Sequence, residues 1–97
     1  MDSNQNITAQ RKAVVTVLGF DRKGIIAQVS RILYESDVNI LDISQTILDG
    51  LFNMVMLVDI TGASFDDLAL ELNSLGERLG LQIRIQRNEI FEAMHQI

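Results

Sequence analysis

An Asp-Gly pair at positions 49 and 50 separates two segments with strand-like sequences. This dipeptide is the strongest short-range signal for a β-hairpin, because both central residues of a type I′ turn take positive φ. The sequence therefore predicts two adjacent antiparallel strands, NILDISQTIL at residues 39–48 and LFNMVMLVDI at residues 51–60.

The two strands of this hairpin differ in how their apolar residues are placed. The first strand alternates, with one apolar face (Leu41, Ile43, Ile47) and one polar face (Asp42, Ser44, Thr46). The second is apolar on both faces, since Phe52, Met54, Met56, Val58 and Ile60 alternate with Val55 and Leu57. We therefore expect the first strand to be half exposed at a sheet edge and the second to be buried on both faces at the centre.

Two further strands are predicted near the ends of the chain. KAVVTVL at residues 12–18 is rich in β-branched residues and apolar on both faces, which indicates a central strand. LQIRIQR at residues 81–87 alternates without exception, which indicates a strand buried on one side.

Apolar residues at helical spacing predict two amphipathic helices. The first has the stripe Ile25, Val29, Ile32 and Leu33, with Asp21 as its predicted N-cap. The second has the stripe Phe65, Leu68, Leu72, Leu75 and Leu79; Ser64 and Asp67 fit a capping box at its start, and Gly80 ends it.

The element order is thus β-α-β-β-α-β, an α+β class. A split βαβ arrangement with sheet order 4-1-3-2 and both helices on one face places the two doubly apolar strands at the centre. The last segment, EIFEAMHQI, is predicted to be a short C-terminal helix that packs on its own domain or on a partner subunit.

Composition limits the function classes. The chain has 97 residues, which is one domain, and we expect a flexible N-terminal tail at 1–11 and a folded domain at 12–97. The sequence has no cysteine, so disulfide and thiolate chemistry are excluded, and no cofactor is expected. A net charge of −5 argues against nucleic acid. No secretory signal or membrane segment is evident, so a cytoplasmic location is expected.

The motif GFDRKGII after the first strand, and VNI at residues 38–40 before the second, resemble the ACT domain over about residues 12–88. DISQTILDG and the ending IFEAMHQI are similar to small bacterial and archaeal proteins that consist of one stand-alone ACT domain. A more distant similarity is to the ACT domains of the glycine-cleavage transcriptional repressor.

The resemblance implies a ferredoxin-like fold and a noncatalytic regulatory role, with an amino acid or similar metabolite bound between subunits of a homodimer or higher oligomer. By position, it implies a ligand site that one subunit lines with its first loop and the other with the start of its second strand. The residues are Gly19, Phe20, Asp21, Gly24 and Ile25, and from the partner Asn39 and Ile40.

The charged loop between Gly19 and Gly24 has two interpretations. Glycines allow a ligand close to the backbone, and a helix N-terminus attracts a carboxylate, while Asp21 could hold an ammonium group. In the other interpretation, Asp21 caps the helix, the basic residues are solvated and the glycines shape a tight turn.

Other functions remain open at this stage. The same fold could be an interaction module without a ligand, pairing through its exposed edge strand with an unknown protein target or a second copy. An acylphosphatase-like enzyme would use Arg22 with Asn39 or Asn53, but no acid, base or nucleophile accompanies them. An RNA-binding sheet lacks paired aromatic residues. His95 has no partner at metal-ligand spacing, so no metal site is predicted.

Overall fold

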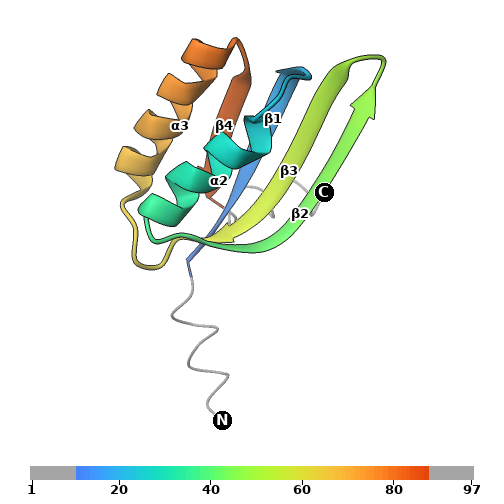
Figure 1. The fold of residues 1–97 in the computed structure, drawn as a ribbon. Coiled ribbons are helices and arrows are strands. Elements are labelled where there is room, and N and C mark those ends of the chain that lie inside the picture. The colour runs from blue at the N-terminus through green and yellow to red at the C-terminus, as the bar shows by residue number, and fades with distance from the viewer. Residues whose placement is uncertain (1–10, 88–97) are drawn as a thin grey trace.

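The computed structural model describes residues 11–87 (Figure 1). Its elements are β1 (Lys12–Phe20), α2 (Ile25–Glu35), β2 (Asn39–Leu48), β3 (Leu51–Asp59), α3 (Phe65–Leu79) and β4 (Gln82–Arg87). The strands form one antiparallel sheet of order β2-β3-β1-β4, which confirms the predicted class and topology. The predicted tail, apart from Arg11, and the predicted C-terminal helix with His95 lie outside the described residues.

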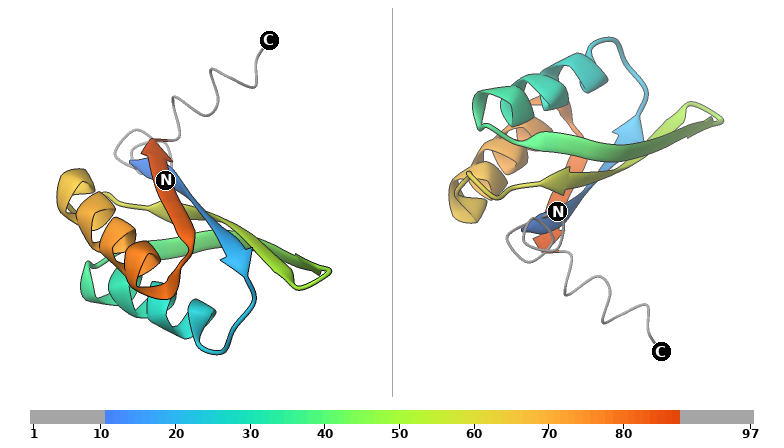
Figure 2. Two further views of the ribbon diagram at one scale, coloured as in Figure 1. Left: turned by 90° about the horizontal axis from the view of Figure 1, so that it is seen from above. Right: turned by 90° about the horizontal axis from the view of Figure 1, so that it is seen from below.

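Both helices pack on the same face of the sheet (Figure 2), and we call the opposite face the open face. The core lies between the helices and the sheet. It is built from the predicted stripes of both helices and from alternate residues of the strands: Ala13, Val15, Val17, Ile25, Val29, Leu33, Phe52, Met54, Met56, Val58, Leu68, Leu72, Leu75 and Ile83 among others. The helical periodicity read from the sequence therefore identified the buried face of each helix.

The hairpin between β2 and β3 turns at the predicted position. Asp49 has φ 53° and Gly50 has φ 80°, so both central residues are left-handed, as a type I′ turn requires. The pairing of Leu48 with Leu51 directly flanks this turn.

The prediction that β3 is buried on both faces is wrong. Its residues alternate, with Phe52 and Met54 in the core while Leu51 and Val55 on the open face are 40% and 39% exposed. The open face of β1 is also exposed toward the end of the strand, at Leu18 and Phe20. Among the described residues no second layer covers this face, so apolar sequence on both sides of a strand did not mean burial on both sides.

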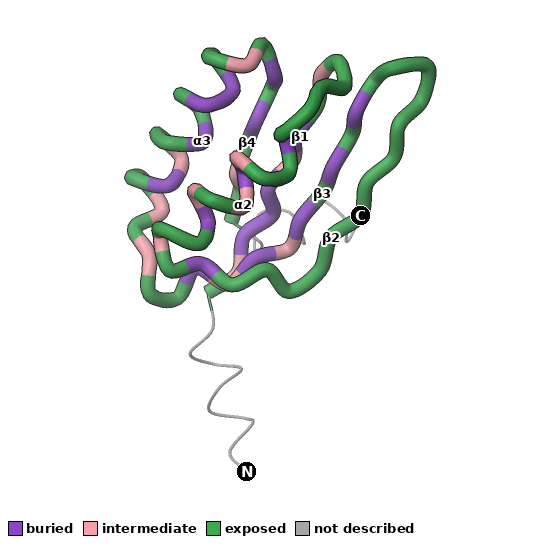
Figure 3. Tube along the Cα trace, in the orientation of Figure 1, coloured by how far each residue is buried: buried purple, intermediate pink, exposed green. Residues whose placement is uncertain are grey.

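Strand β2 is exposed along its whole length (Figure 3), although one face was predicted to be buried. The helices lie over the other strands, and the β2–β3 hairpin extends beyond them (Figure 1). A register shift between Ile40 and Asp42 leaves Leu41 without a cross-strand partner, so the predicted alternation from Leu41 to Ile43 is interrupted there. The β2 residues that are both large and apolar are Ile40, Leu41, Ile43, Ile47 and Leu48.

The helix ends agree with the sequence prediction in α3 and differ from it in α2. The Asp67 N–H donates to Ser64 Oγ at 3.2 Å, and Gly80 ends α3 with φ 72°. In α2 the N-cap is Gly24, with φ 85° and no side-chain cap, so the prediction that Asp21 caps this helix is wrong. The chain runs three residues past Asp21 before the helix starts, which puts that carboxylate beyond the reach of the first-turn N–H groups.

Candidate functional site

The loop at residues 21–24 connects β1 to α2 and is tied to two other parts of the fold. The Asp21 N–H donates to the carbonyl oxygen of Gly50 in the hairpin turn at 2.9 Å. The Arg22 Nη1 donates to the carbonyl oxygen of Leu79 at the end of α3, at 3.3 Å. The first contact holds the backbone of the loop at Asp21 and the second holds the Arg22 side chain, while all four loop residues stay exposed.

A shallow depression of about 410 Å³ lies beside this loop. It combines the loop, the first turn of α2 and one core side chain of β3, namely Asp21, Arg22, Gly24, Ile25, Ile26, Ala27 and Phe52. Three of the predicted site residues, Asp21, Gly24 and Ile25, are thus brought together. The presence of Phe52 at the depression could not be predicted from the sequence, because the β1–β3 register that pairs it with Gly19 places it there.

Two other loop residues of the predicted site do not line the depression. Gly19 lies on the core side of β1, where a Cβ atom would overlap the side chain of Leu81, so close packing explains this glycine. Phe20 is 78% exposed and belongs to the open face, with Leu51 as its cross-strand neighbour.

The N-terminus of α2 differs in electrostatics from that of α3. The first turn of α3 carries Asp66 and Asp67 after its Ser64 cap, so its positive end is neutralised. The first turn of α2 has no acidic residue and no side-chain cap. The first N–H groups of a helix have no intrahelical partner, and the residues of this turn, Ile25, Ile26 and Ala27, line the depression. This end of α2 can attract an anionic group.

The remaining predicted residues, Asn39 and Ile40, lie at the other end of the sheet. Asn39 is level with Asp59 of β3, whereas Gly19 is level with Phe52, seven residues away along the same strand. At about 3.3 Å per residue, this separates the two halves of the predicted site by roughly 23 Å. One chain therefore does not bring both halves together.

The two residues also point to different faces. Ile40 pairs with Val58 and shares its face with the helices, as the depression does, whereas Asn39 pairs with Asp59 on the open face. Of the two, Ile40 is on the side of the sheet where the loop depression lies.

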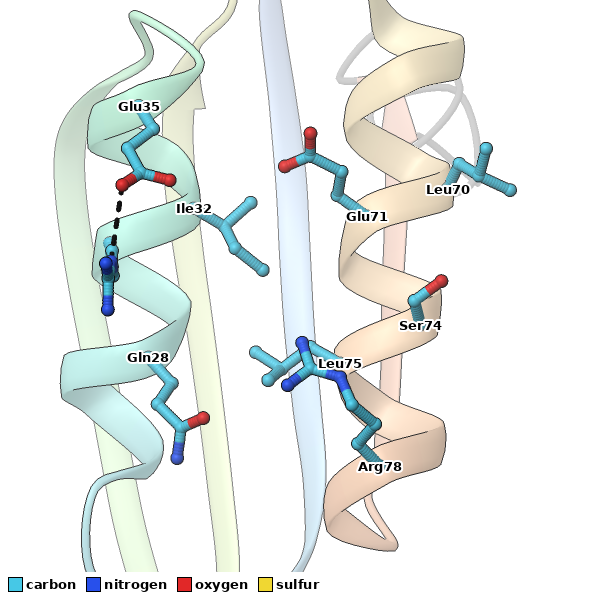
Figure 4. A pocket seen from close by; sticks show the side chains of 9 residues that line it. Gln28, Ile32, Glu35, Leu70, Glu71, Ser74, Leu75 and Arg78 are labelled. Carbon is cyan, nitrogen blue, oxygen red and sulfur yellow. Dashed lines mark hydrogen bonds and ion pairs between the residues drawn. The ribbon is translucent and has the colours of Figure 1, made fainter.

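A second depression, of about 450 Å³, runs between the exposed sides of α2 and α3 (Figure 4). Ile32 and Leu75 point into it, with Arg78 toward one end and Glu71 toward the other. It contains none of the predicted site residues.

The residues that an acylphosphatase-like enzyme would need are not brought together in the described part of the chain. Arg22 contacts the end of α3, while Asn53 is on the open face between Leu18 and Thr46 and Asn39 is at the far end of the sheet. Within residues 11–87 there is no group of three or more His, Cys, Asp or Glu side chains placed to hold a metal ion. The same residues contain no helix with the length and apolar character to cross a bilayer.

Comparison with known proteins identifies the family. The ACT domain model matches residues 11–86. A UPF0237 protein of Methanocaldococcus jannaschii is 52% identical over 88 residues, covering 89% of this chain and 98% of that protein. An ACT domain protein from Streptococcus pneumoniae superimposes with a TM-score of 0.74 and 42% identity, covering 84% of this chain and 94% of the other.

A glycine cleavage system transcriptional repressor has a structure that also superimposes with a TM-score of 0.74. It is 26% identical, and the match covers 80% of this chain and 46% of the repressor, so the more distant similarity seen in the sequence is confirmed. ACT domains are regulatory small-molecule-binding domains that commonly oligomerise. The matched residues, the βαββαβ order and the relatives of nearly equal length together show that the chain belongs to the ACT domain family and, within it, to the UPF0237 proteins.

Proposed function

We propose that this chain is a noncatalytic regulatory module that binds an amino acid or a similar small metabolite beside the loop at residues 21–24. The observation that carries the proposal is the depression where this loop meets the uncapped N-terminus of α2. The ACT family supplies the class of ligand.

The charges around the depression suit a zwitterion. The N–H groups at the start of α2 donate to an α-carboxylate, because the helix dipole is positive there and no acidic side chain occupies the first turn. The Asp21 carboxylate, which also lines the depression, accepts hydrogen bonds from the α-ammonium. Ile26 and Phe52 then contact the aliphatic part of the ligand.

A homodimer completes this site. A depression open to solvent on one side buries little of a small ligand, and small-molecule sites bury most of the ligand surface. The second half of the site, with Ile40, comes from another subunit, since it lies about 23 Å away within one chain.

Thermal unfolding in the presence of each of the twenty amino acids tests the proposal. A five-atom amino acid gains at most about −7.5 kcal/mol, so the ligands are supplied at about 10 mM. A ligand at 100 times its Kd adds about 2.7 kcal/mol, which raises the Tm of a domain of this size by several degrees.

The matched variants are Asp21→Asn and Asp66→Asn. Both remove one carboxylate near a helix start, but only Asp21 lines the depression. We expect the ligand-induced shift to be lost in Asp21→Asn and kept in Asp66→Asn. Equal shifts in both variants contradict the assignment of the ammonium to Asp21.

A second candidate function is an interaction module without a ligand. The five exposed large apolar residues of β2 favour it, because a long apolar edge strand is a surface for strand pairing. No shift with any compound, from a folded protein of defined oligomeric state, supports this alternative.

A further inference from the structure

Two valines on the open face of the sheet differ sharply in burial. Val14 of β1 and Val55 of β3 are each flanked by a paired strand on both sides. Val14 is 5% exposed, although it is not part of the core between helices and sheet, whereas Val55 is 39% exposed. Both helices lie on the other face (Figure 2), so no helix or strand within residues 11–87 accounts for the burial of Val14.

Burial on the open face decreases along the strands, away from the end of the sheet where β4 stops. On β1 the exposed fraction rises from Val14 to 39% at Leu18 and 78% at Phe20. On β3, Leu57, the cross-strand neighbour of Val14, is half-buried. Arg87, the last residue of β4, is level with the residue before Val14. The cover over Val14 therefore belongs to the end of the sheet that includes Arg87.

Two segments outside the described residues are attached at this end of the sheet, because residues 1–10 lead into β1 and residues 88–97 follow β4. Their sequences differ. MDSNQNITAQ at residues 1–10 has only two large apolar residues, Met1 and Ile7. NEIFEAMHQI at residues 88–97 has four, at the spacing of one helical face: Ile90, Phe91, Met94 and Ile97. The second segment has the composition that covers an apolar surface.

We propose that residues 88–97 form an amphipathic helix that crosses the open face of their own chain from β4 toward β2, with its apolar side on Val14 and Leu57. This inference goes beyond the regulatory function and does not depend on the ligand site.

The width of the sheet at this level fits such a helix. Gln86, Val14, Leu57 and Asp42 form one row across the open face, in the strand order β4, β1, β3, β2. Neighbouring strands are about 4.8 Å apart, so the row is about 14 Å wide. Ten helical residues rise about 15 Å. The segment is therefore long enough to cross all four strands.

The spacing of the apolar residues fits the spacing of the strands. Residues three apart in a helix are about 4.5 Å apart along its axis, which is close to the distance between neighbouring strands. When Phe91 lies over Val14 of β1, Met94 falls over Leu57 of β3 and Ile97 reaches β2.

Charges near β1 and β4 favour the same placement. Lys12 and Arg84 are on the open face, on either side of the row that contains Val14. Glu89 and Glu92 are on the polar side of the helical pattern, in its first half, where the helix dipole also favours acidic residues. Exposed ion pairs add little, so the apolar contacts supply most of the stabilisation.

NMR spectroscopy of the full chain tests the contacts. We expect nuclear Overhauser effects between the Phe91 ring and the Val14 methyl groups, and between the Met94 and Leu57 methyl groups. Leu18 should show none to Phe91, because it lies about 13 Å farther along β1. A mixed sample of isotope-labelled and unlabelled chains shows whether the contacts arise within one chain. Contacts that arise only between chains overturn the assignment to the same chain.

Two neighbouring substitutions test the contribution of the segment to stability. Phe91→Ala should lower the Tm by at least about 4 °C, because it removes the ring that covers Val14. Glu92→Ala is the matched control on the polar side, and its Tm should stay within about 3 °C of the wild type. Equal effects of the two substitutions contradict an apolar side that faces the sheet.

Double variants test whether Phe91 acts on Val14 in particular. In Val14→Ala, Phe91→Ala the loss of Tm should be smaller than the sum of the single losses by at least about 2 °C. In Leu18→Ala, Phe91→Ala the losses should simply add, because Leu18 is on the same strand but outside the proposed contact. Additive losses in both double variants overturn the proposal.

Removal of residues 1–10 tests the other segment that could cover Val14. We expect the Tm and the contacts of Val14 to be unchanged. If this deletion lowers the Tm and Phe91→Ala does not, the N-terminal segment is the cover and the proposal is wrong. All of these measurements are made without an added amino acid, so their failure is distinguishable from failure of the proposed ligand site.

Discussion

The backbone N–H of Asp21 donates a hydrogen bond to the carbonyl oxygen of Gly50 at 2.9 Å. This bond joins the β1–α2 loop to the turn of the β2–β3 hairpin, across 29 positions of sequence. The loop that lines the candidate site is therefore positioned by the hairpin, and its conformation should respond to changes in the turn.

Hydrogen exchange tests this dependence. We expect the amide of Asp21 to be protected and that of Lys23, for which no acceptor is recorded among residues 11–87, to exchange rapidly. Gly50→Val strains the turn, because φ 80° is strongly disfavoured for a β-branched residue, and it should reduce protection at Asp21. The amide of Val29 in α2 serves as the control. Equal exchange rates at Asp21 and Lys23 in the wild type contradict the proposed positioning.

Gly76 is required by the close approach of α3 to the start of β4. A Cβ atom at this position would lie 2.7 Å from the Leu81 carbonyl oxygen, and the Leu81 N–H donates to the Gly76 carbonyl oxygen at 2.8 Å. We expect Gly76→Ala to lower the free energy of unfolding by about 1–3 kcal/mol through overpacking, despite the higher helix propensity of alanine.

The matched control for Gly76 is Asn73→Ala in the same helix. Asn73 is exposed, so alanine should leave stability unchanged or raise it slightly. Chemical denaturation with urea measures both variants. A neutral Gly76→Ala would mean that α3 can move away from Leu81 at little cost.

Asp37 follows the C-cap residue of α2, Ser36, and has a left-handed conformation with φ 63°. The Val38 N–H donates to the Leu33 carbonyl oxygen and the Asp37 N–H to that of Tyr34, which is the Schellman pattern. Glycine adopts this conformation without a Cβ penalty. Asp37→Gly should therefore raise the free energy of unfolding by about 0.5–1 kcal/mol.

Asp37→Ala separates the conformational effect from the loss of a charge. Alanine lacks the carboxylate, as glycine does, but tolerates positive φ less well than aspartate. We expect Asp37→Ala to be less stable than the wild type when Asp37→Gly is more stable. A higher free energy of unfolding in both variants would point instead to the removal of negative charge from an acidic protein.

Features set by neighbouring residues could be predicted from the sequence. The turn at Asp49–Gly50 and the Ser64 cap depend on two to four residues and occur where expected. The N-cap of α2 was wrongly predicted, because the position of Asp21 depends on its bond to Gly50 rather than on the sequence around it. Local signals do not contain that information.

Burial was harder to predict than topology. Leu51 and Val55 have the residue types of a buried strand, yet the layer that would cover them is absent from the described chain. The alternation of residues along a strand indicates which of them share a face. Whether that face is covered depends on the packing of helices or of another subunit. Of the residues that line the candidate depression, Asp21, Gly24 and Ile25 were predicted, because they are close together in the sequence, whereas Phe52 was not, because the β1–β3 register supplies it.

Gly19 provides a test that separates close packing from ligand contact. The Cβ atom of an alanine here would overlap the end of the Leu81 side chain and lie 3.4 Å from the Leu81 Cα. Leu81 is buried, so Leu81→Ala alone should cost about 2–5 kcal/mol, and Gly19→Ala alone should cost about 1–3 kcal/mol.

In the double variant Gly19→Ala, Leu81→Ala, the overlapping atoms are gone, and the new methyl group partly fills the space that the leucine left. The combined loss should therefore be smaller than the sum of the single losses by at least about 0.5 kcal/mol, measured as a double-mutant cycle. If the two losses simply add, Leu81 is not what excludes a side chain at Gly19, and a requirement for ligand or loop backbone at this position regains support. The Tm shift with any amino acid that binds, measured in the double variant, then distinguishes a requirement for ligand contact from a requirement for the loop backbone.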